Sequence, residues 1–181
     1  MCEEKILMNK HQIDESIKKI SNDIINEFGD MSNVTLVGIQ TRGVEIAKRI
    51  KKLLELHSGN EIKMGTLDIT FYRDDLATRG IIPAIKETTI EFNITKKIVI
   101  LVDDVIFTGR TTKAAMETLM SFGRPQIIRL AVLIDRGNRE LPIQPDYCGI
   151  KINTKLNDKV KVRLNETDGI EDTVLWCVEE G

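Results

Sequence analysis

An α/β fold, built on a mostly parallel sheet with helices on both faces, is the fold class that this sequence predicts. Short apolar runs at residues 34–39, 97–102 and 126–135 alternate with segments in which apolar residues recur at helical spacing. Strands that alternate with helices form βαβ units, whose strands are parallel and whose helices cover the sheet. No linker divides the 181 residues into two comparable parts, so we predict a single domain over residues 1–181.

The first half of the chain contains two helical patterns and two strand patterns. Apolar residues recur every three or four positions from residue 10 to residue 28, and Gly29 then ends the predicted helix. The run "VTLVGI" (34–39) is predicted to be a buried strand, and residues 43–59 a second amphipathic helix. The weakly alternating stretch 61–72 is rich in β-branched residues and is predicted to be a strand.

The second half of the chain repeats this alternation. It predicts a buried strand at 97–102, a helix at 111–122 and a further strand at 126–135. Three short β-like segments follow, at residues 146–150, 159–164 and 173–178. We expect these late strands and the N-terminal helix to form a small cap over one end of the sheet.

The composition argues against several classes of protein. The net charge of −2 gives no indication that the molecule as a whole binds nucleic acid. The three cysteines, Cys2, Cys148 and Cys177, lack CxxC spacing and are expected to be free thiols in a reducing compartment. No apolar run approaches the roughly 18 residues of a membrane-spanning helix, and the N-terminus lacks an apolar signal core. We therefore expect a cytoplasmic protein with no membrane partner.

Three polar stretches follow predicted strands: "QTRG" (40–43), "DDVIFTGRTT" (103–112) and "DRGNRE" (135–140). In open α/β sheets, ligands bind beyond the carboxyl ends of the strands. Each stretch contains an arginine, and two of them contain aspartate. Groups suited to a polar, anionic ligand are therefore expected to converge on this edge of the sheet.

The stretch 103–112 suits a phosphorylated sugar. Ionised Asp103 and Asp104 at a strand end need water, a cation or hydroxyl groups around them. Residues 108–112 precede a helix, where free backbone N–H groups and the helix dipole favour an anion. The chain has no GxxxxGK[ST], which argues against a nucleoside triphosphatase. A structural alternative stays open, in which the threonines cap the helix and the aspartates are solvated.

The stretch "VDDVIFTGRTT" resembles the phosphoribosyl-pyrophosphate (PRPP) motif of type I phosphoribosyltransferases. Further stretches are similar to the pyrimidine operon attenuation protein/uracil phosphoribosyltransferase family: "LVGIQTRG", "GTLDITFYRDDL", "GRPQIIRLAVLIDRGNRELPIQPDY" and "KVKVRLNETDG". The similarity runs from about Ile13 to Gly169. It implies the type I phosphoribosyltransferase fold with a small cap (hood). It also implies transfer of a phosphoribosyl group from PRPP to uracil, giving UMP and diphosphate, with Mg²⁺ as the cofactor.

The resemblance assigns roles to residues of two stretches. Asp103 and Asp104 would bind the ribose hydroxyls of PRPP and hold Mg²⁺, directly or through water. Thr41, Arg42 and Gly43 match the pyrophosphate loop, where Arg42 would supply positive charge to the leaving group. Backbone and hydroxyl groups of five consecutive residues would hold the 5′-phosphate: Thr108, Gly109, Arg110, Thr111 and Thr112.

The long irregular segment 73–88 matches the family's mobile catalytic flap. A loop of this length in a compact domain is usually functional. Arg73, within "YRDDL" (72–76), is the flap residue expected to meet the diphosphate, and Asp74 and Asp75 either assist it or are simply solvated. The catalytic residues implied by the resemblance are thus Arg42, Arg73, Asp103 and Asp104.

Asp135 and Arg136 fall where the family recognises the base, partly through nearby backbone groups. Some purine-specific relatives carry an acidic residue inside the PRPP loop that serves as a base for the nucleobase. Here that position is Phe107, which favours a pyrimidine substrate and leaves no general base to assign.

Members of this family also bind the leader of pyrimidine-operon mRNA when UMP is present, through a basic face built from dimers. The resemblance therefore implies a homodimer or higher oligomer, with Lys18, Arg139 and Lys151 as candidate RNA contacts. A UMP-sensing RNA-binding regulator is the alternative function, and a PRPP sensor without turnover is a third. Lys18 itself and five further positions depart from the family's RNA-binding pattern, which favours the enzyme: Asn22, Glu27, Asn138, Gln144 and Ile150.

Overall fold

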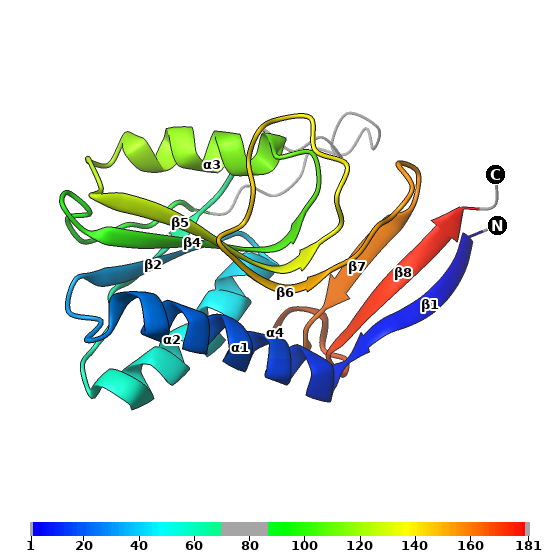
Figure 1. Ribbon diagram of the computed structural model, residues 1–181, viewed down its shortest axis with the longest axis horizontal. Helices are drawn as coiled ribbons and strands as arrows, with labels where there is room; N and C mark the ends of the chain where they lie inside the picture. The colour runs from blue at the N-terminus through cyan, green and yellow to red at the C-terminus, as the bar shows by residue number, and fades with distance from the viewer. Residues whose placement is uncertain (1, 70–86, 180–181) are drawn as a thin grey trace.

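A computed structural model describes residues 2–69 and 87–179 of the chain, which form two sheets and their helices (Figure 1). The larger sheet has the strand order β3-β2-β4-β5-β6, and every neighbouring pair in it is parallel. Its strands are β2 (Val34–Ile39), β3 (Met64–Leu67), β4 (Ile98–Ile106), β5 (Ile127–Asp135) and β6 (Tyr147–Lys151).

Helices cover both faces of this sheet, as predicted. Helices α1 (Lys10–Phe28) and α2 (Arg42–Ser58) lie on one face, and α3 (Arg110–Met120) lies on the other (Figure 1). Alternate residues of β4 belong to different cores, because successive strand side chains point to opposite faces. Ile100 and Val102 pack in the core shared with α1 and α2, whereas Leu101 packs in the core shared with α3.

The smaller sheet stands at one end of the larger one (Figure 1). It is antiparallel with the order β1-β8-β7, and its strands are β1 (Cys2–Asn9), β7 (Lys159–Arg163) and β8 (Thr173–Glu179). The short helix α4 (Asn165–Asp168) connects β7 to β8. This sheet with α4 is the hood.

The composition of the hood corrects the prediction in two respects. Helix α1 is not part of it, because its apolar face is buried against the larger sheet and α2. Strand β6 is not part of it either, since β6 pairs in parallel with β5. The N-terminal strand β1, which the sequence did not predict, takes their place by pairing with β8.

Two further differences concern the ends of elements. Strand β4 continues to Ile106 instead of stopping at Val102, so Asp103 and Asp104 lie inside the strand. Aspartate is disfavoured in strands, but pairing with β5 extends the ladder as far as Ile106 and Asp135. Among the described residues of the predicted strand 61–72, only Met64–Leu67 is a strand. No helix in the described ranges is long and apolar enough to cross a membrane.

Candidate active site

The start of α2 lies directly against the strand that carries the two aspartates. Strands β2 and β4 are neighbours, and α2 begins just after β2. A Cβ atom on Gly43 would lie 2.5 Å from the carbonyl oxygen of Val102 and 3.1 Å from the Cα of Asp103. Only glycine permits so close an approach. The "TRG" stretch and the aspartates, about 60 residues apart in the chain, are therefore brought into contact as predicted.

The two helices that begin at this edge lack the side-chain cap that α1 has. Asn9 caps α1: Gln12 N donates to Asn9 Oδ1 over 3.0 Å, and Asn9 N donates to Gln12 Oε1 over 2.9 Å. By contrast, α2 follows Thr41, after a cis peptide bond, and α3 follows Gly109, whose φ is 93°. Neither residue makes a side-chain cap hydrogen bond. The first turns of α2 and α3 thus present N–H groups to an anion.

Hydrogen bonds from the β5–β6 connection hold the loop before α3. Glu140 N donates to the carbonyl oxygen of Thr108 over 2.9 Å, and Arg110 N donates to Thr108 Oγ1 over 3.2 Å. The exposed Arg110 side chain donates from Nε to Glu140 Oε2 over 2.6 Å. The N–H groups of Thr111 and Thr112 make no hydrogen bond with the described part of the chain. An anion at α3 would therefore meet backbone groups rather than the Arg110 guanidinium.

The two aspartates differ in exposure and in their remaining hydrogen-bonding capacity. Asp103 is 5% exposed, and its Oδ1 accepts a hydrogen bond from Asp104 N over 2.8 Å. Asp104 is half-buried, and its Oδ1 accepts one from Val105 N over 2.9 Å. Its Oδ2 has no hydrogen-bond partner among the described residues.

These carboxylates fit a cation that is held mainly by substrate. No group of three or more His, Cys, Asp or Glu side chains in the described residues could hold a metal ion. Mg²⁺ usually binds through one or two carboxylates, several waters and substrate phosphates. Asp103 and Asp104 match that donor set, provided that the phosphorylated ligand brings the remaining oxygens.

Arg42 forms an ion pair that the sequence did not predict. Its Nη2 donates to Asp168 Oδ1 over 2.7 Å and its Nε to Asp168 Oδ2 over 3.3 Å. Asp168 lies in α4 of the hood. Burial alone would raise the pKa of Asp168, but hydrogen bonds from Arg42 and from Leu164 N hold that pKa below its usual value. A sequence separation of 126 residues explains why no local pattern indicated this pair.

The side chains of Asp135 and Arg136, which were predicted to recognise the base, are buried and bond to other groups of the protein. Asp135 is 2% exposed, pairs with Arg139 over 2.7 Å and accepts a hydrogen bond from Gly137 N. Arg136 is 8% exposed, and its guanidinium carbon lies 3.9 Å from the centre of the Phe107 ring. The Arg136 donors bond to Thr154 Oγ1 and to the carbonyl oxygens of Lys155 and Asp158. These two side chains are therefore already engaged by other groups of the protein.

The remaining predicted residues fall into three groups. Arg73, Asp74 and Asp75 lie outside the described residues. Lys18 is exposed on α1, where it pairs with Glu15, and Lys151 is exposed at the end of β6. Unlike these two lysines, Arg139 is largely buried, and its side chain is 12% exposed. Its guanidinium donates to the carbonyl oxygens of Phe107, Gly137 and Ile143.

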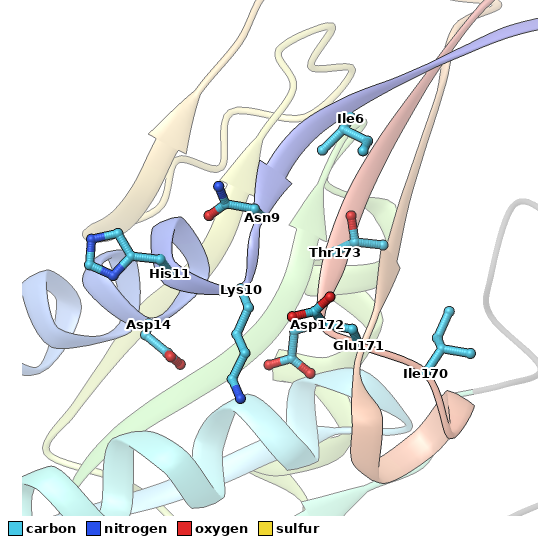
Figure 2. A pocket seen from close by; sticks show the side chains of 9 residues that line it. All are labelled: Ile6, Asn9, Lys10, His11, Asp14, Ile170, Glu171, Asp172 and Thr173. Atoms are coloured by element: carbon cyan, nitrogen blue, oxygen red, sulfur yellow. The ribbon is translucent and has the colours of Figure 1, made fainter.

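A cavity of about 680 Å³ lies elsewhere, between the start of α1 and the beginning of β8 (Figure 2). Figure 2 shows Lys10 reaching from α1 toward Asp172 and Glu171. Its described lining is of mixed charge and includes none of the residues that the sequence predicted for the active site. This cavity is therefore not the predicted PRPP site.

Comparison with known proteins places the chain in a family. The model of the phosphoribosyl transferase domain matches residues 5–167. The bifunctional protein PyrR of Chloroflexus aurantiacus is 46% identical over 175 residues, which cover 97% of this chain and 96% of that protein. The bifunctional protein PyrR of Clostridioides difficile is 46% identical over 174 residues, covering 96% and 98% respectively.

Solved structures of lower sequence identity share the fold. A hypoxanthine phosphoribosyltransferase of Trypanosoma cruzi is 18% identical, with a TM-score of 0.73 and coverage of 97% of both chains. A hypoxanthine-guanine phosphoribosyltransferase of Bacillus anthracis is 21% identical, with a TM-score of 0.66, covering 84% of this chain and 85% of that one. At such identities the likeness shows the fold alone.

Proposed function

Because this chain belongs to the phosphoribosyltransferase family, together with the bifunctional PyrR proteins, we propose that it transfers the phosphoribosyl group of PRPP to uracil. The products are UMP and diphosphate. The proposal takes the reaction class from the family and the base from the sequence resemblance to uracil phosphoribosyltransferases. It assigns the PRPP site to the edge where β2 and β4 end.

The observation that carries this proposal is the adjacency of two uncapped helix starts and two carboxylates. PRPP has an anionic group at each end, the 5′-phosphate and the diphosphate, with two ribose hydroxyls between them. The first turns of α3 and α2 offer N–H groups for two anions. Asp103 and Asp104 lie between these helices and offer acceptors for the hydroxyls. The order of groups in the ligand matches their order in the site.

In the proposed reaction, a uracil nitrogen forms a bond to the anomeric carbon of the ribose as the bond to diphosphate breaks. The start of α3 holds the 5′-phosphate, and the two aspartates orient the sugar. Arg42 carries the positive charge that stabilises the leaving diphosphate. Mg²⁺, held by Asp103 and Asp104 together with PRPP oxygens, would supply further charge neutralisation. No side chain is assigned as a general base, so the proton of the attacking nitrogen passes to water or to the departing diphosphate.

The surroundings of Phe107 support a pyrimidine over a purine. The Arg136 guanidinium covers the Phe107 ring, so this part of the loop presents an aromatic ring and no carboxylate. A purine enzyme that uses an acidic residue here would lack it in this chain. The base-binding role therefore falls to backbone groups near Asp135 and Arg136.

The test is an assay of purified protein with Mg²⁺, PRPP and labelled uracil. We expect UMP to form, and Asp104→Asn to reduce kcat/KM by roughly 10²-fold, because the transition state loses a fixed negative charge beside the sugar. Glu117→Gln, at an exposed ion pair on α3, is the matched control and should leave the rate unchanged. Formation of a nucleotide from hypoxanthine but not from uracil would overturn the choice of base.

A second proposed function is UMP-dependent binding to the leader of pyrimidine-operon mRNA. The relatives are named bifunctional, and two candidate contacts, Lys18 and Lys151, are exposed on α1 and β6, which pack together. A filter-binding titration of such a leader, with and without UMP, tests this. Lys151→Gln should weaken binding and reduce its salt dependence, because phosphate contacts release counterions. Affinity that does not change with UMP would count against this function.

The assembly proposed with this second function is a homodimer or higher oligomer. The family resemblance carries this proposal, since the RNA-binding face is built from dimers. Sedimentation velocity of the purified chain measures the assembly directly, and a monomer at the concentrations of the RNA titration would contradict it.

A further inference from the structure

The two-point contact between Arg42 and Asp168 uses the edge of the guanidinium formed by Nε and Nη2. It leaves the edge formed by Nη1 and Nη2 available to a ligand. Arginine has five N–H donors arranged on a rigid plane. Asp168 accepts from Nε and from one donor of Nη2. The Nη1 group makes no hydrogen bond with residues 2–69 or 87–179. An anion could therefore bind the edge formed by Nη1 and Nη2 while Asp168 keeps its own contact.

Asp168 is itself held in place before any ligand binds. Its Oδ2 accepts a hydrogen bond from Leu164 N over 2.8 Å. Its neighbour in α4, Glu166, receives two hydrogen bonds from Arg49 of α2, of 2.9 and 2.7 Å. Helix α4 is thus attached to α2 at two points, and the Asp168 carboxylate is a fixed acceptor beside Arg42, the first residue of α2.

Such an arrangement reduces the cost of binding a diphosphate. A free arginine side chain is flexible, and ordering it on binding costs conformational entropy. Arg42 is already ordered, with its side chain 33% exposed and its free edge accessible. Within residues 2–69 and 87–179, the Asp168 carboxylate accepts hydrogen bonds from Arg42 and Leu164 N, so its effect on the substrate passes through Arg42.

We propose that Asp168 of the hood is a positioning residue, which orients Arg42 so that its Nη1 and Nη2 donors receive the diphosphate group of PRPP. This inference rests on the proposed function of the same site. In this proposal the hood takes part in the reaction, because α4 supplies the Asp168 carboxylate that orients the Arg42 guanidinium of α2. The class of ligand that the oriented Arg42 would bind is a magnesium-bound diphosphate or its ester.

The experiment compares Asp168→Asn with Glu4→Gln, a control that removes an exposed, ion-paired carboxylate of the hood without touching Arg42 or α4. Binding of magnesium diphosphate is measured by titration calorimetry, and KM and kcat for PRPP are measured by UMP formation. We expect Asp168→Asn to raise both the diphosphate Kd and the KM about tenfold, less than the roughly 10²-fold cost of a group misplaced by 1 Å. Glu4→Gln should change neither by more than about twofold.

A double-mutant cycle separates positioning from a structural effect. If Asp168 acts through Arg42, then Asp168→Asn has no further effect on diphosphate binding in an Arg42→Gln background. Additive losses, or equal losses from Asp168→Asn and Glu4→Gln, would overturn the proposal. Should Asp168→Asn not fold, Arg42→Lys serves instead, because it keeps the charge but loses the two-point contact and should weaken diphosphate binding similarly.

The binding measurement also separates this inference from the proposed function. If wild-type protein forms no UMP but binds magnesium diphosphate, and Asp168→Asn weakens that binding as expected, the positioning role stands and the assigned reaction fails. If UMP forms and Asp168→Asn binds diphosphate as well as wild type does, the reaction stands and the positioning role fails.

Discussion

At the scale of single residues, the site depends on one close backbone contact as much as on its charged groups. Gly43 lets the first turn of α2 lie against the Asp103 backbone, which places Arg42 near the two carboxylates. An additional methyl group here would meet main-chain atoms of β4, which cannot move aside as a flexible side chain can. The glycine of "TRG" therefore has a packing role that is independent of any ligand.

The prediction at this scale concerns Gly43→Ala. In an ordinary helix this change stabilises a protein by up to about 1 kcal/mol. Here we expect it to lower the free energy of unfolding by about 1–3 kcal/mol, as overpacking does, and to reduce PRPP affinity. Urea unfolding followed by Trp176 fluorescence measures the stability. A variant as stable as wild type would contradict this packing role of Gly43.

At the scale of elements, helix starts are divided between structural and ligand-binding uses. The capping box of α1 satisfies the N–H groups of Asn9 and Gln12, whereas α2 and α3 have no side-chain cap and are proposed to bind a ligand there. The loop before α3 is held from outside the helix, through the hydrogen bond from Glu140 N to the Thr108 carbonyl. The start of α1 thus contributes to stability, and the proposed ligand binding falls to the starts of α2 and α3.

This division predicts the outcome of Asn9→Ala. Loss of the cap should lower the free energy of unfolding by about 1 kcal/mol and leave KM for PRPP unchanged, because α1 is remote from the start of α3. Asn26→Ala, at an exposed asparagine near the end of the same helix, is the control. Equal stability of the two variants in urea would contradict a capping role for Asn9.

At the scale of the whole molecule, a cluster of charges joins the hood to the larger sheet. Arg49 of α2 donates to the buried Asp172 just before β8 over 2.5 Å, and to Glu166 of α4. Burial would raise the pKa of Asp172, but hydrogen bonds from Arg49 and Asn165 N lower it overall. The hydrogen bond from Arg49 likewise lowers the pKa of Glu166. This cluster fixes α4, and with it the Asp168 carboxylate.

The lowered pKa values predict how acid affects stability. A carboxyl group whose pKa is lower in the folded state stabilises the fold above its unfolded pKa, about 4 for Asp and Glu, and loses this contribution as pH falls through the folded value. We expect the free energy of unfolding to fall below about pH 4. Arg49→Met should cost about 3 kcal/mol at pH 7, because Asp172 is left buried without its partner, and should flatten this pH dependence. Urea unfolding at a series of pH values provides the check, and an unchanged acid slope in Arg49→Met would contradict it.

Much of the fold could be predicted because its signals are local. The apolar spacing from Ile13 to Phe28 and the run 34–39 predicted α1 and β2 with the bounds that the structure has. The position of β1 could not be predicted, since it depends on pairing with β8 at the other end of the chain. The extension of β4 through Asp103 also depends on a neighbour, because pairing with β5 outweighs the low strand preference of aspartate.

By itself, the sequence determined the alternation of strands and helices from α1 to β5, and the loops in which a phosphorylated ligand could bind. These features follow from spacing within a few residues and from backbone groups at helix starts. Only the tertiary structure decided that Arg42 pairs with Asp168, that Arg139 turns inward and that Arg136 covers Phe107. Each of these contacts joins elements that are distant in the chain, and its geometry is set by how the hood and the loops pack on the sheet.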